Sequence, residues 1–106
     1  MPNVIVSPAA FTDLQSLRLH LEQDFGEAVA VAKLRRLYKV LKRLETFPSM
    51  GRRRDQIHAG FHSFAVSPNV IMYRFVSENT VEIVRVVDGR VDLEALFRAD
   101  ETAENI

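Results

Sequence analysis

The sequence has 106 residues, of which 47% are hydrophobic and 26% are charged, a composition typical of one globular domain. It contains no cysteine, and this excludes disulfides, thiolate metal sites and cysteine nucleophiles. The formal net charge is zero, but residues 33–54 hold nine basic residues and one acidic residue, a local balance of +8. Positive charge is therefore concentrated in one part of the chain.

The start of the sequence lacks the charged segment and the long apolar core of a signal peptide. No apolar run approaches the roughly 20 residues that are needed to span a bilayer. We therefore expect a cytoplasmic protein with no membrane partner, in which residues 1–106 form a single domain.

A short apolar run at residues 4–6 predicts a first strand. Ser7 and Pro8 then favour a helix start, because the Ser hydroxyl can cap free N–H groups and Pro fits the first helical turn. Apolar residues at helical spacing continue toward Gly26, which predicts the end of this first helix. The apolar positions are Ala10, Leu14, Leu17 and Leu21.

Residues 27–46 predict a second helix that ends before Phe47 and Pro48. Its apolar stripe consists of Ala30, Leu34, Leu37, Leu41 and Leu44. The opposite side carries Arg35, Arg36, Lys39, Lys42 and Arg43. Because only Gly26 separates the two helices, we expect an antiparallel hairpin with both apolar stripes facing a sheet.

A polar connection at residues 50–59 contains three consecutive arginines, at positions 52–54. Three β-rich runs then follow between Gly60 and Asp88, separated by turn residues at 67–69 and 77–80. This pattern is typical of an antiparallel meander. The order of elements is β-α-α-β-β-β, and the predicted fold class is α+β.

A two-residue turn at Glu78–Asn79 predicts that Val76 pairs with Val81 and that Arg74 pairs with Ile83. One sheet face would then carry Ile71, Tyr73, Phe75, Val84 and Val86, and the other would carry Met72, Arg74, Val76, Val81, Ile83 and Arg85. The first face can cover the helical hairpin. The second is too apolar for solvent, so we expect residues 92–97 or a partner chain to cover it. Residues from about 99 to 106 are expected to form a flexible acidic tail.

Several motifs occur in a fixed order along nearly the whole chain, to about Phe97. They are Ala10-x-x-Asp13-Leu14, Leu44-x-x-x-Pro48-x-x-Gly51-Arg52, Gly60-Phe61-x-Ser63-Phe64, Ile71-x-Tyr73-Arg74 and Val81-Glu82-Ile83-Val84-Arg85-Val86. Together they resemble the ParE branch of the ParE/RelE superfamily of bacterial toxins. The resemblance implies a RelE/ParE-like fold and the toxin role in a type II toxin–antitoxin module of the plasmid-stabilisation kind. It also implies a cognate antitoxin, a toxin–antitoxin hetero-oligomer, DNA gyrase as the inhibited target, and no cofactor.

The resemblance leaves two other functions open. A RelE-like member would cut mRNA on the ribosome, using basic residues on the central strands and a Tyr or His near the C-terminus. The corresponding strand positions are Phe61, Ser63 and Val70, and the segment after Arg90 contains neither Tyr nor His. We therefore assign no catalytic residue and expect gyrase inhibition by binding. The third function is that of a non-toxic relative that only binds an antitoxin. His62 and Asp88 depart from the ParE pattern, and their roles stay open.

The charged side chains supply candidate binding sites. The candidate target-binding residues are Arg74, Arg85 and Arg90, with Asp88, Asp92 or Glu94 as the expected ion-pair partners of the first two. The candidate antitoxin-binding residues are Arg36, Lys39 and Arg43 on the second helix together with Met72, Val81 and Ile83 on the sheet. For the helix, a solvated face and a contact with nucleic-acid phosphates are the alternatives, and we expect no sequence-specific DNA binding by this chain alone. His58 and His62 lack a third ligand, so we expect no metal site.

Overall fold

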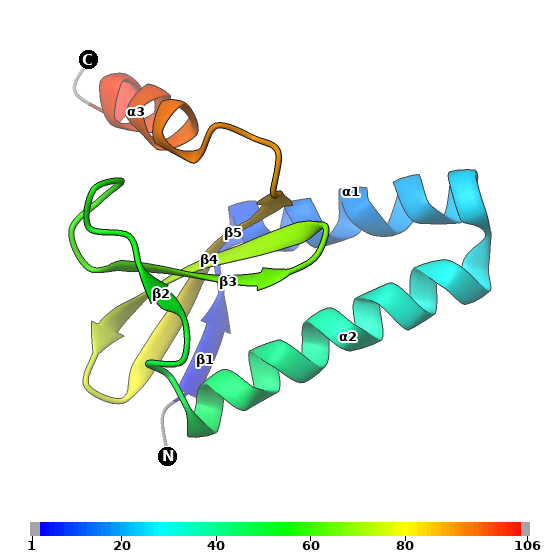
Figure 1. The fold of residues 1–106 in the computed structure, drawn as a ribbon, viewed down its shortest axis with the longest axis horizontal. Coiled ribbons are helices and arrows are strands. Elements are labelled where there is room, and N and C mark those ends of the chain that lie inside the picture. The colour runs from blue at the N-terminus through cyan, green and yellow to red at the C-terminus, as the bar shows by residue number, and fades with distance from the viewer. Residues whose placement is uncertain (1–2, 105–106) are drawn as a thin grey trace.

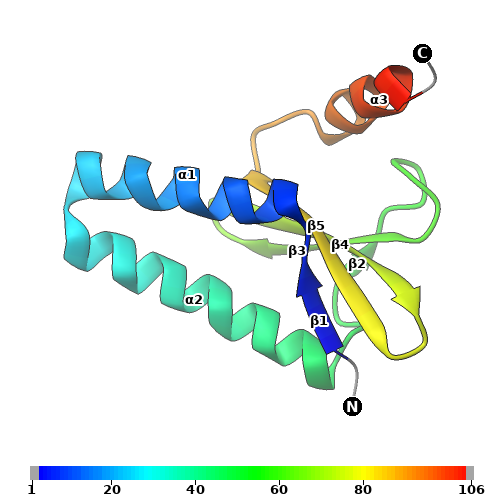
Figure 2. The same cartoon turned by 180° about the vertical axis from the view of Figure 1, so that it is seen from behind.

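The computed structural model describes the backbone of residues 3–104 and the side chains of residues 3–98. The elements are β1 (Asn3–Val6), α1 (Pro8–Phe25), α2 (Glu27–Thr46), β2 (Arg52–Arg53), β3 (Phe61–Val66), β4 (Asn69–Ser77), β5 (Thr80–Asp88) and α3 (Leu93–Glu104). One mixed sheet has the order β1-β5-β4-β3-β2, with β1 parallel to β5 and the other neighbours antiparallel. In both views α3 lies apart from the hairpin of α1 and α2 (Figures 1 and 2). The α+β class is confirmed.

The two long helices begin and end where the sequence predicted. The Ser7 hydroxyl accepts a hydrogen bond from the Ala10 N–H at 3.1 Å and donates one to the Val84 carbonyl at 2.9 Å, so the cap of α1 is also tied to β5. Gly26 lies between the helices with a φ of 89°, in the region that glycine adopts without strain. Its N–H donates to the Glu22 carbonyl, which closes α1 before α2 begins.

The main core lies between the helical hairpin and one face of the sheet. It is lined by the apolar stripes of both helices and by alternate residues of the central strands. Its buried members are Ala10, Leu14, Leu37, Leu41, Leu44, Val66, Ile71, Tyr73, Val81, Ile83 and Val86. Burial of this much apolar surface is the principal term that stabilises the domain.

The predicted turn between β4 and β5 is correct, but the predicted register beyond it is wrong. Ser77 pairs with Thr80, yet Phe75 pairs with Val81 and Tyr73 pairs with Ile83, because Val76 is an extra residue on β4. A second irregularity, at Val84 on β5, restores the pairing of Ile71 with Val86. Since a shift of one residue reverses every side chain, Val81 and Ile83 face the helices, opposite to the prediction.

The second face of the sheet is covered by the chain itself. Helix α3 packs Phe97, together with Leu93 and Leu96, against Phe61 and Met72. The rings of Phe61 and Phe97 meet edge to face, with centroids 5.0 Å apart. The expectation that residues 92–97 fold back is therefore confirmed. The backbone is helical to Glu104, where the sequence indicated a flexible tail, and residues 105–106 lie outside the described part of the chain.

Part of the arginine-rich connection is a short strand rather than a loop. Arg52 and Arg53 form β2, which pairs with Ser63 and His62 at the edge of the sheet. Just before it, the Gly51 N–H donates to the buried Tyr73 hydroxyl at 2.9 Å. A Cβ at Gly51 would lie 2.5 Å from that hydroxyl and 2.8 Å from the Ser63 carbonyl, so the chain needs glycine here.

No helix within residues 3–104 is long and apolar enough to cross a membrane.

The fold is organised around one sheet with two unequal layers. The hairpin of α1 and α2 lies on one face and α3 on the other.

Candidate interaction surfaces

Arg74 lies on β4 with its side chain 46% exposed. Its Nε donates to Glu82 Oε1 at 3.0 Å, across the strand pair. The predicted partners were Asp88, Asp92 or Glu94, and that pairing is wrong because Glu82 lies directly opposite Arg74 in the observed register. Arg74 therefore remains accessible while its charge is partly balanced within the sheet.

Arg85 is turned toward α1 rather than toward solvent. Its Nε and Nη2 donate to the two carboxylate oxygens of Asp13, at 2.7 and 3.0 Å. The same carboxylate accepts the Val86 N–H at 2.9 Å. The predicted pairing with Asp88, Asp92 or Glu94 is wrong, since the Arg85 guanidinium donates to Asp13 on the first helix. A bidentate pair of this kind fixes orientation, so Arg85 joins α1 to β5 and has little freedom to bind a target.

Arg90 lies in the turn after β5, with its side chain 90% exposed. Its Nε and Nη2 donate to the two oxygens of Asp88 at 2.9 and 2.8 Å, and its backbone N–H also donates to that carboxylate. These hydrogen bonds and the positive charge lower the pKa of Asp88 to about 2. Asp88, at a position where the ParE resemblance commonly has His, therefore holds Arg90 in place.

Three residues predicted to bind an antitoxin are inside the protein. Met72, Val81 and Ile83 are each fully buried. Val81 and Ile83 lie under α1 and α2 because of the register, and Met72 lies under α3. Their placement on an exposed sheet face is therefore wrong, and only Met72 would become accessible if α3 moved.

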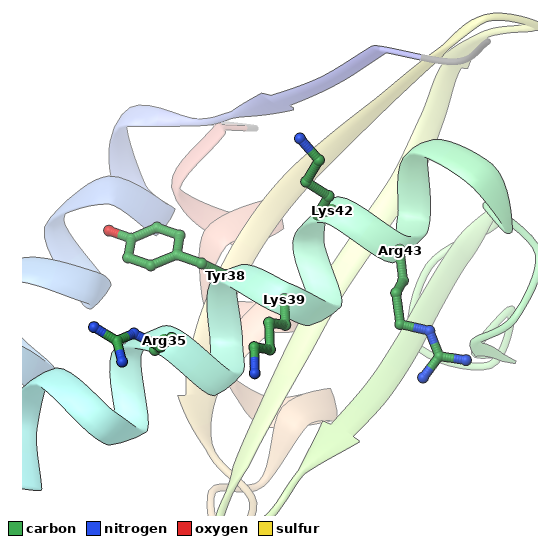
Figure 3. Close-up of a pocket in the computed structure, with 5 residues that line it drawn as sticks. All are labelled: Arg35, Tyr38, Lys39, Lys42 and Arg43. Carbon is green, nitrogen blue, oxygen red and sulfur yellow. The ribbon is translucent and has the colours of Figure 1, made fainter.

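The predicted basic side of α2 is present and is hollowed. Figure 3 shows five side chains projecting from successive turns of α2. They are Arg35, Tyr38, Lys39, Lys42 and Arg43, and they line a shallow hollow of about 470 Å³, here called the α2 hollow. Most of its lining is apolar, because the aliphatic stems and the Tyr38 ring form its walls while the charged ends lie at the rim. In the described part of the chain, none of the four cations has a carboxylate partner.

Three cations of α2 were predicted to bind an antitoxin. Of these, Lys39 and Arg43 line the α2 hollow and Arg36 does not. Arg36 lies on another flank of α2, in a small recess with Lys33 and with Val66, Ser67 and Asn69 near the β3–β4 turn. Arg35 and Lys42 lie on the predicted basic side but outside the predicted antitoxin-binding set. Tyr38 is also outside that set, although an aromatic residue beside a basic helical stripe is a recognisable signal.

A second hollow lies between the two helices. It has a volume of about 450 Å³ and is here called the interhelix hollow. It is lined by Phe11, Leu14, Gln15, Arg18, Val31, Leu34, Arg35 and Tyr38. Phe11 is 55% exposed and Tyr38 is 54% exposed. Because Arg35 and Tyr38 line both hollows, the two form one continuous surface along the outer side of the hairpin.

The positions that would carry RelE-like catalysis have structural roles here. Phe61 is buried against Phe97. Ser63 is only 5% exposed, and its hydroxyl accepts a hydrogen bond from Arg54 Nε at 2.8 Å. Val70 packs at the edge of the same small cluster. The basic Arg54 side chain lies beside Ser63, and the sequence indicated it only as part of an arginine run.

Two of the three histidines, His58 and His62, lie against aromatic rings. The His58 ring stacks on Phe61 with centroids 4.7 Å apart, and the His62 ring stacks on Tyr73 with centroids 5.2 Å apart.

Two titratable groups near these rings have shifted pKa values. Burial raises the pKa of the Tyr73 hydroxyl, and a hydrogen bond from the Gly60 N–H lowers the pKa of Asp55. Among the described residues, no three His, Cys, Asp or Glu side chains are grouped as metal ligands would be.

The chain matches the family described as "ParE toxin of type II toxin-antitoxin system, parDE" over residues 4–93. It belongs to the ParE toxin family. Toxin ParE3 of Caulobacter vibrioides is 36% identical over 95 residues, covering 90% of this chain and 94% of that protein. Toxin ParE1 of Mycobacterium tuberculosis is 29% identical over 90 residues, covering 85% and 92%.

Solved structures agree with the ParE fold. A chain from the chromosomal ParDE toxin–antitoxin system of P. aeruginosa matches with a TM-score of 0.72 and 19% identity, covering 83% of this chain and 96% of that one. A chain from the RelBE2 toxin–antitoxin complex of Mycobacterium tuberculosis matches with a TM-score of 0.53 and 24% identity, covering 83% and 99%. The ParE domain of this chain thus has the fold of the wider ParE/RelE superfamily.

Proposed function

We propose that this ParE-family protein is a toxin that inhibits DNA gyrase by binding it, and that a cognate antitoxin keeps it inactive in the cytoplasm. The observation that carries the proposal is the match to the ParE family over residues 4–93, with 36% identity to Toxin ParE3. The target is inferred from the family.

Support for binding rather than catalysis comes from the sheet. Ribosome-dependent cleavage by a RelE-like toxin needs groups that move protons and stabilise phosphate charge. At the corresponding positions this chain has Phe61, Ser63 and Val70, and the helix after β5 packs Leu93, Leu96 and Phe97 onto the same face. RNA cleavage remains the second candidate, with Arg54 beside Ser63 as the basic group on that face.

Support for an antitoxin partner comes from both the family and the surface. The family description places ParE in a type II toxin–antitoxin system. This chain exposes apolar side chains on the outer side of the hairpin, with Phe11 and Tyr38 more than half exposed. Exposed apolar groups gathered around a hollow are typical of a surface that binds another protein.

The direct test incubates the folded protein with gyrase, ATP and supercoiled plasmid and measures trapped linear DNA. We expect linear product that rises with toxin concentration and disappears when the antitoxin is added first. Arg74→Ala and Arg90→Ala remove two exposed candidate contacts without touching the core, so each should raise the concentration needed for half-maximal trapping. Arg85→Ala also breaks the contact with Asp13, so its result counts only if circular dichroism shows an intact fold.

Two outcomes would replace this function. If supercoiling continues unchanged and no linear DNA appears, ribosome-bound mRNA is the next substrate. Cleavage there that is lost in Arg54→Ala would support a RelE-like endonuclease. Normal growth on expression alone, with antitoxin binding retained, would instead identify a non-toxic relative.

A further inference from the structure

The solvent-facing side of α2 carries charge of one sign. Five exposed cations lie there, here called the basic face: Arg35, Arg36, Lys39, Lys42 and Arg43. Figure 3 shows four of them projecting from the helix. The two acidic residues of α2, Glu27 and Glu45, lie about a third of a turn away from Lys39, because a helix advances by about 100° per residue. No acidic side chain of α2 therefore lies among the five cations.

The cations of the basic face differ from other arginines of the molecule in their surroundings. Six arginines outside α2 lie within 4.0 Å of a carboxylate, namely Arg18, Arg53, Arg74, Arg85, Arg90 and Arg98. In the part of the chain that the structure describes, no carboxylate is this close to any member of the basic face. Like charges that share one face repel one another, and a bound polyanion relieves this repulsion.

We propose that the basic face binds the backbone of duplex DNA without reading its sequence. The inference rests on the proposed function for the choice of DNA, since gyrase acts on duplex DNA. Arg and Lys side chains carry hydrogen-bond donors and no acceptor, and phosphate oxygens accept such bonds at any sequence. Phosphate contacts carry no direct sequence information, which agrees with the expectation of no sequence-specific DNA binding by this chain.

The dimensions of the basic face fit a phosphate backbone. Arg35 and Arg43 are eight positions apart and span about 12 Å of helix rise, with Lys39 halfway between them. One strand of duplex DNA has a phosphate about every 3.4 Å along its axis, so several phosphates lie within reach of this row. Arg36 and Lys42 lie on either side of the row by helical periodicity, which widens the contact. A helix about 10–12 Å in diameter also fits a major groove about 12 Å wide.

The charge distribution of the whole chain favours one orientation toward a polyanion. Residues 33–54 have a balance of +8 in a chain of zero net charge, so the other residues have a balance of −8. DNA is therefore attracted toward α2 and repelled by acidic parts of the surface. A membrane surface fits less well, because the apolar stripe of α2 is buried in the main core and cannot enter a bilayer.

Direct binding tests the basic face without gyrase. The probe is a fluorescein-labelled duplex of about 20 base pairs and mixed sequence, and anisotropy measures its affinity. Five phosphate contacts predict a salt slope of about −4.5 on logarithmic axes, and hence an affinity that falls at least about a hundredfold between about 50 and 200 mM salt. Lys39→Gln with Lys42→Gln removes two contacts, so the slope should change to about −2.7 and binding at the lower salt should weaken at least about tenfold.

A matched variant locates the contact. Arg53→Gln with Arg98→Gln removes the same charge from exposed positions outside α2, and it should leave the affinity within about twofold and the slope unchanged. Gln has nearly the helix propensity of Lys, and circular dichroism must show an intact fold for each variant. Equal losses in the control and test variants would overturn the proposal, as would an unchanged slope in Lys39→Gln/Lys42→Gln.

Three other polyanions test the choice of DNA. They are duplex RNA of the same length, polyglutamate at equal charge, and vesicles that contain phosphatidylserine. We expect each to bind at least severalfold more weakly than the DNA duplex. For RNA the physical reason is its deep and narrow major groove, which a protein helix cannot enter. Equal or tighter binding of any of the three would overturn the proposal.

The gyrase reaction separates this proposal from the proposed function. Lys39→Gln/Lys42→Gln should need at least about threefold more protein for half-maximal trapping of linear DNA, while its affinity for gyrase without DNA stays within about twofold. If the variant and wild type trap equally, gyrase inhibition stands and the surface is wrong. A loss of affinity for gyrase alone would also overturn the proposal. If the wild type binds duplex DNA through α2 but traps no linear product, the surface stands and the gyrase function is wrong.

Discussion

The two faces of the sheet differ in how they are covered. On one face, two helices of 18 and 20 residues bury a core that extends from Ala10 to Val86. On the other, α3 covers a smaller cluster, whose buried members among the side chains described (residues 3–98) are Phe61, Met72 and Phe97. The first face therefore defines the domain, while the second is closed by a single helix attached through one turn. Local stability should differ accordingly between the two layers.

The largest effect should come from the core under α1 and α2. Leu44 is fully buried there, and Leu44→Ala removes its packing and leaves a cavity. We expect the free energy of unfolding to fall by about 3–4 kcal/mol. Urea unfolding followed by circular dichroism measures the loss, and a change below about 1 kcal/mol would show that this face is not the dominant core.

Phe97→Ala tests the other face. Phe97 packs edge to face on Phe61 but belongs to a smaller cluster, so we expect a loss of about 2 kcal/mol, below the usual range for fully buried aromatic residues. Amide hydrogen exchange should accelerate throughout α3 while the amides of β4 and β5 keep their protection. Uniform acceleration in all strands would contradict the distinction between the two layers.

Asp13→Asn tests the link between α1 and β5. The substitution removes a bidentate partner of Arg85 and weakens the acceptor of the Val86 N–H, and the pair is mostly but not fully buried. We expect a loss of about 2 kcal/mol, less than for a fully enclosed ion pair. Glu82→Gln is the matched control, since its partner Arg74 is about half exposed, and it should cost less than about 1 kcal/mol. Similar losses in the two variants would show that Asp13 has no special role.

The smallest effect concerns Asp88, whose side chain is partly exposed. Its folded-state pKa of about 2 lies below the ordinary value of 3.8, so the contact with Arg90 stabilises the folded protein above about pH 4. This contribution is lost as the pH falls from about 4 to 2. NMR titration of the side-chain carboxyl should give a pKa near 2 in the wild type and a higher value in Arg90→Gln, still below 3.8 because the backbone N–H of residue 90 keeps its hydrogen bond to the carboxylate. An unchanged pKa in the variant would mean that Arg90 does not cause the shift.

Local sequence signals predicted the helices well. Ser7 and Pro8 marked the start of α1, Gly26 marked the break between the helices, and Phe47 followed the end of α2. The basic side of α2 could also be located, because helical periodicity determines which residues lie opposite an apolar stripe. Helical periodicity could not show that Tyr38 and four cations line a hollow, since a hollow depends on the shapes of side chains in three dimensions.

The sheet was predicted less accurately for a specific reason. The turn at Glu78–Asn79 was correct, but a pattern that alternates every two residues cannot reveal an extra residue within a strand. Val76 is such a residue, and it reversed the expected sides of Val81 and Ile83, whereas the extra Val84 restores the predicted register beyond it. Arg85 lies in the predicted register opposite Met72, but its partner Asp13 is 72 positions away in the sequence, and the strand pattern could not reveal it.

The sequence by itself determined the composition of the domain, the two long helices, the number and order of the main strands, and membership of the ParE family. The helices and strands depend on local propensity and periodicity, which act over a few neighbouring residues, whereas family membership rests on similarity along residues 4–93. Only the tertiary structure decided the strand register, the packing of α3 on the second face, the bond between Arg85 and Asp13, and the joined hollows on the hairpin. Each of these depends on contacts between distant segments, and such contacts form only when the whole core is packed.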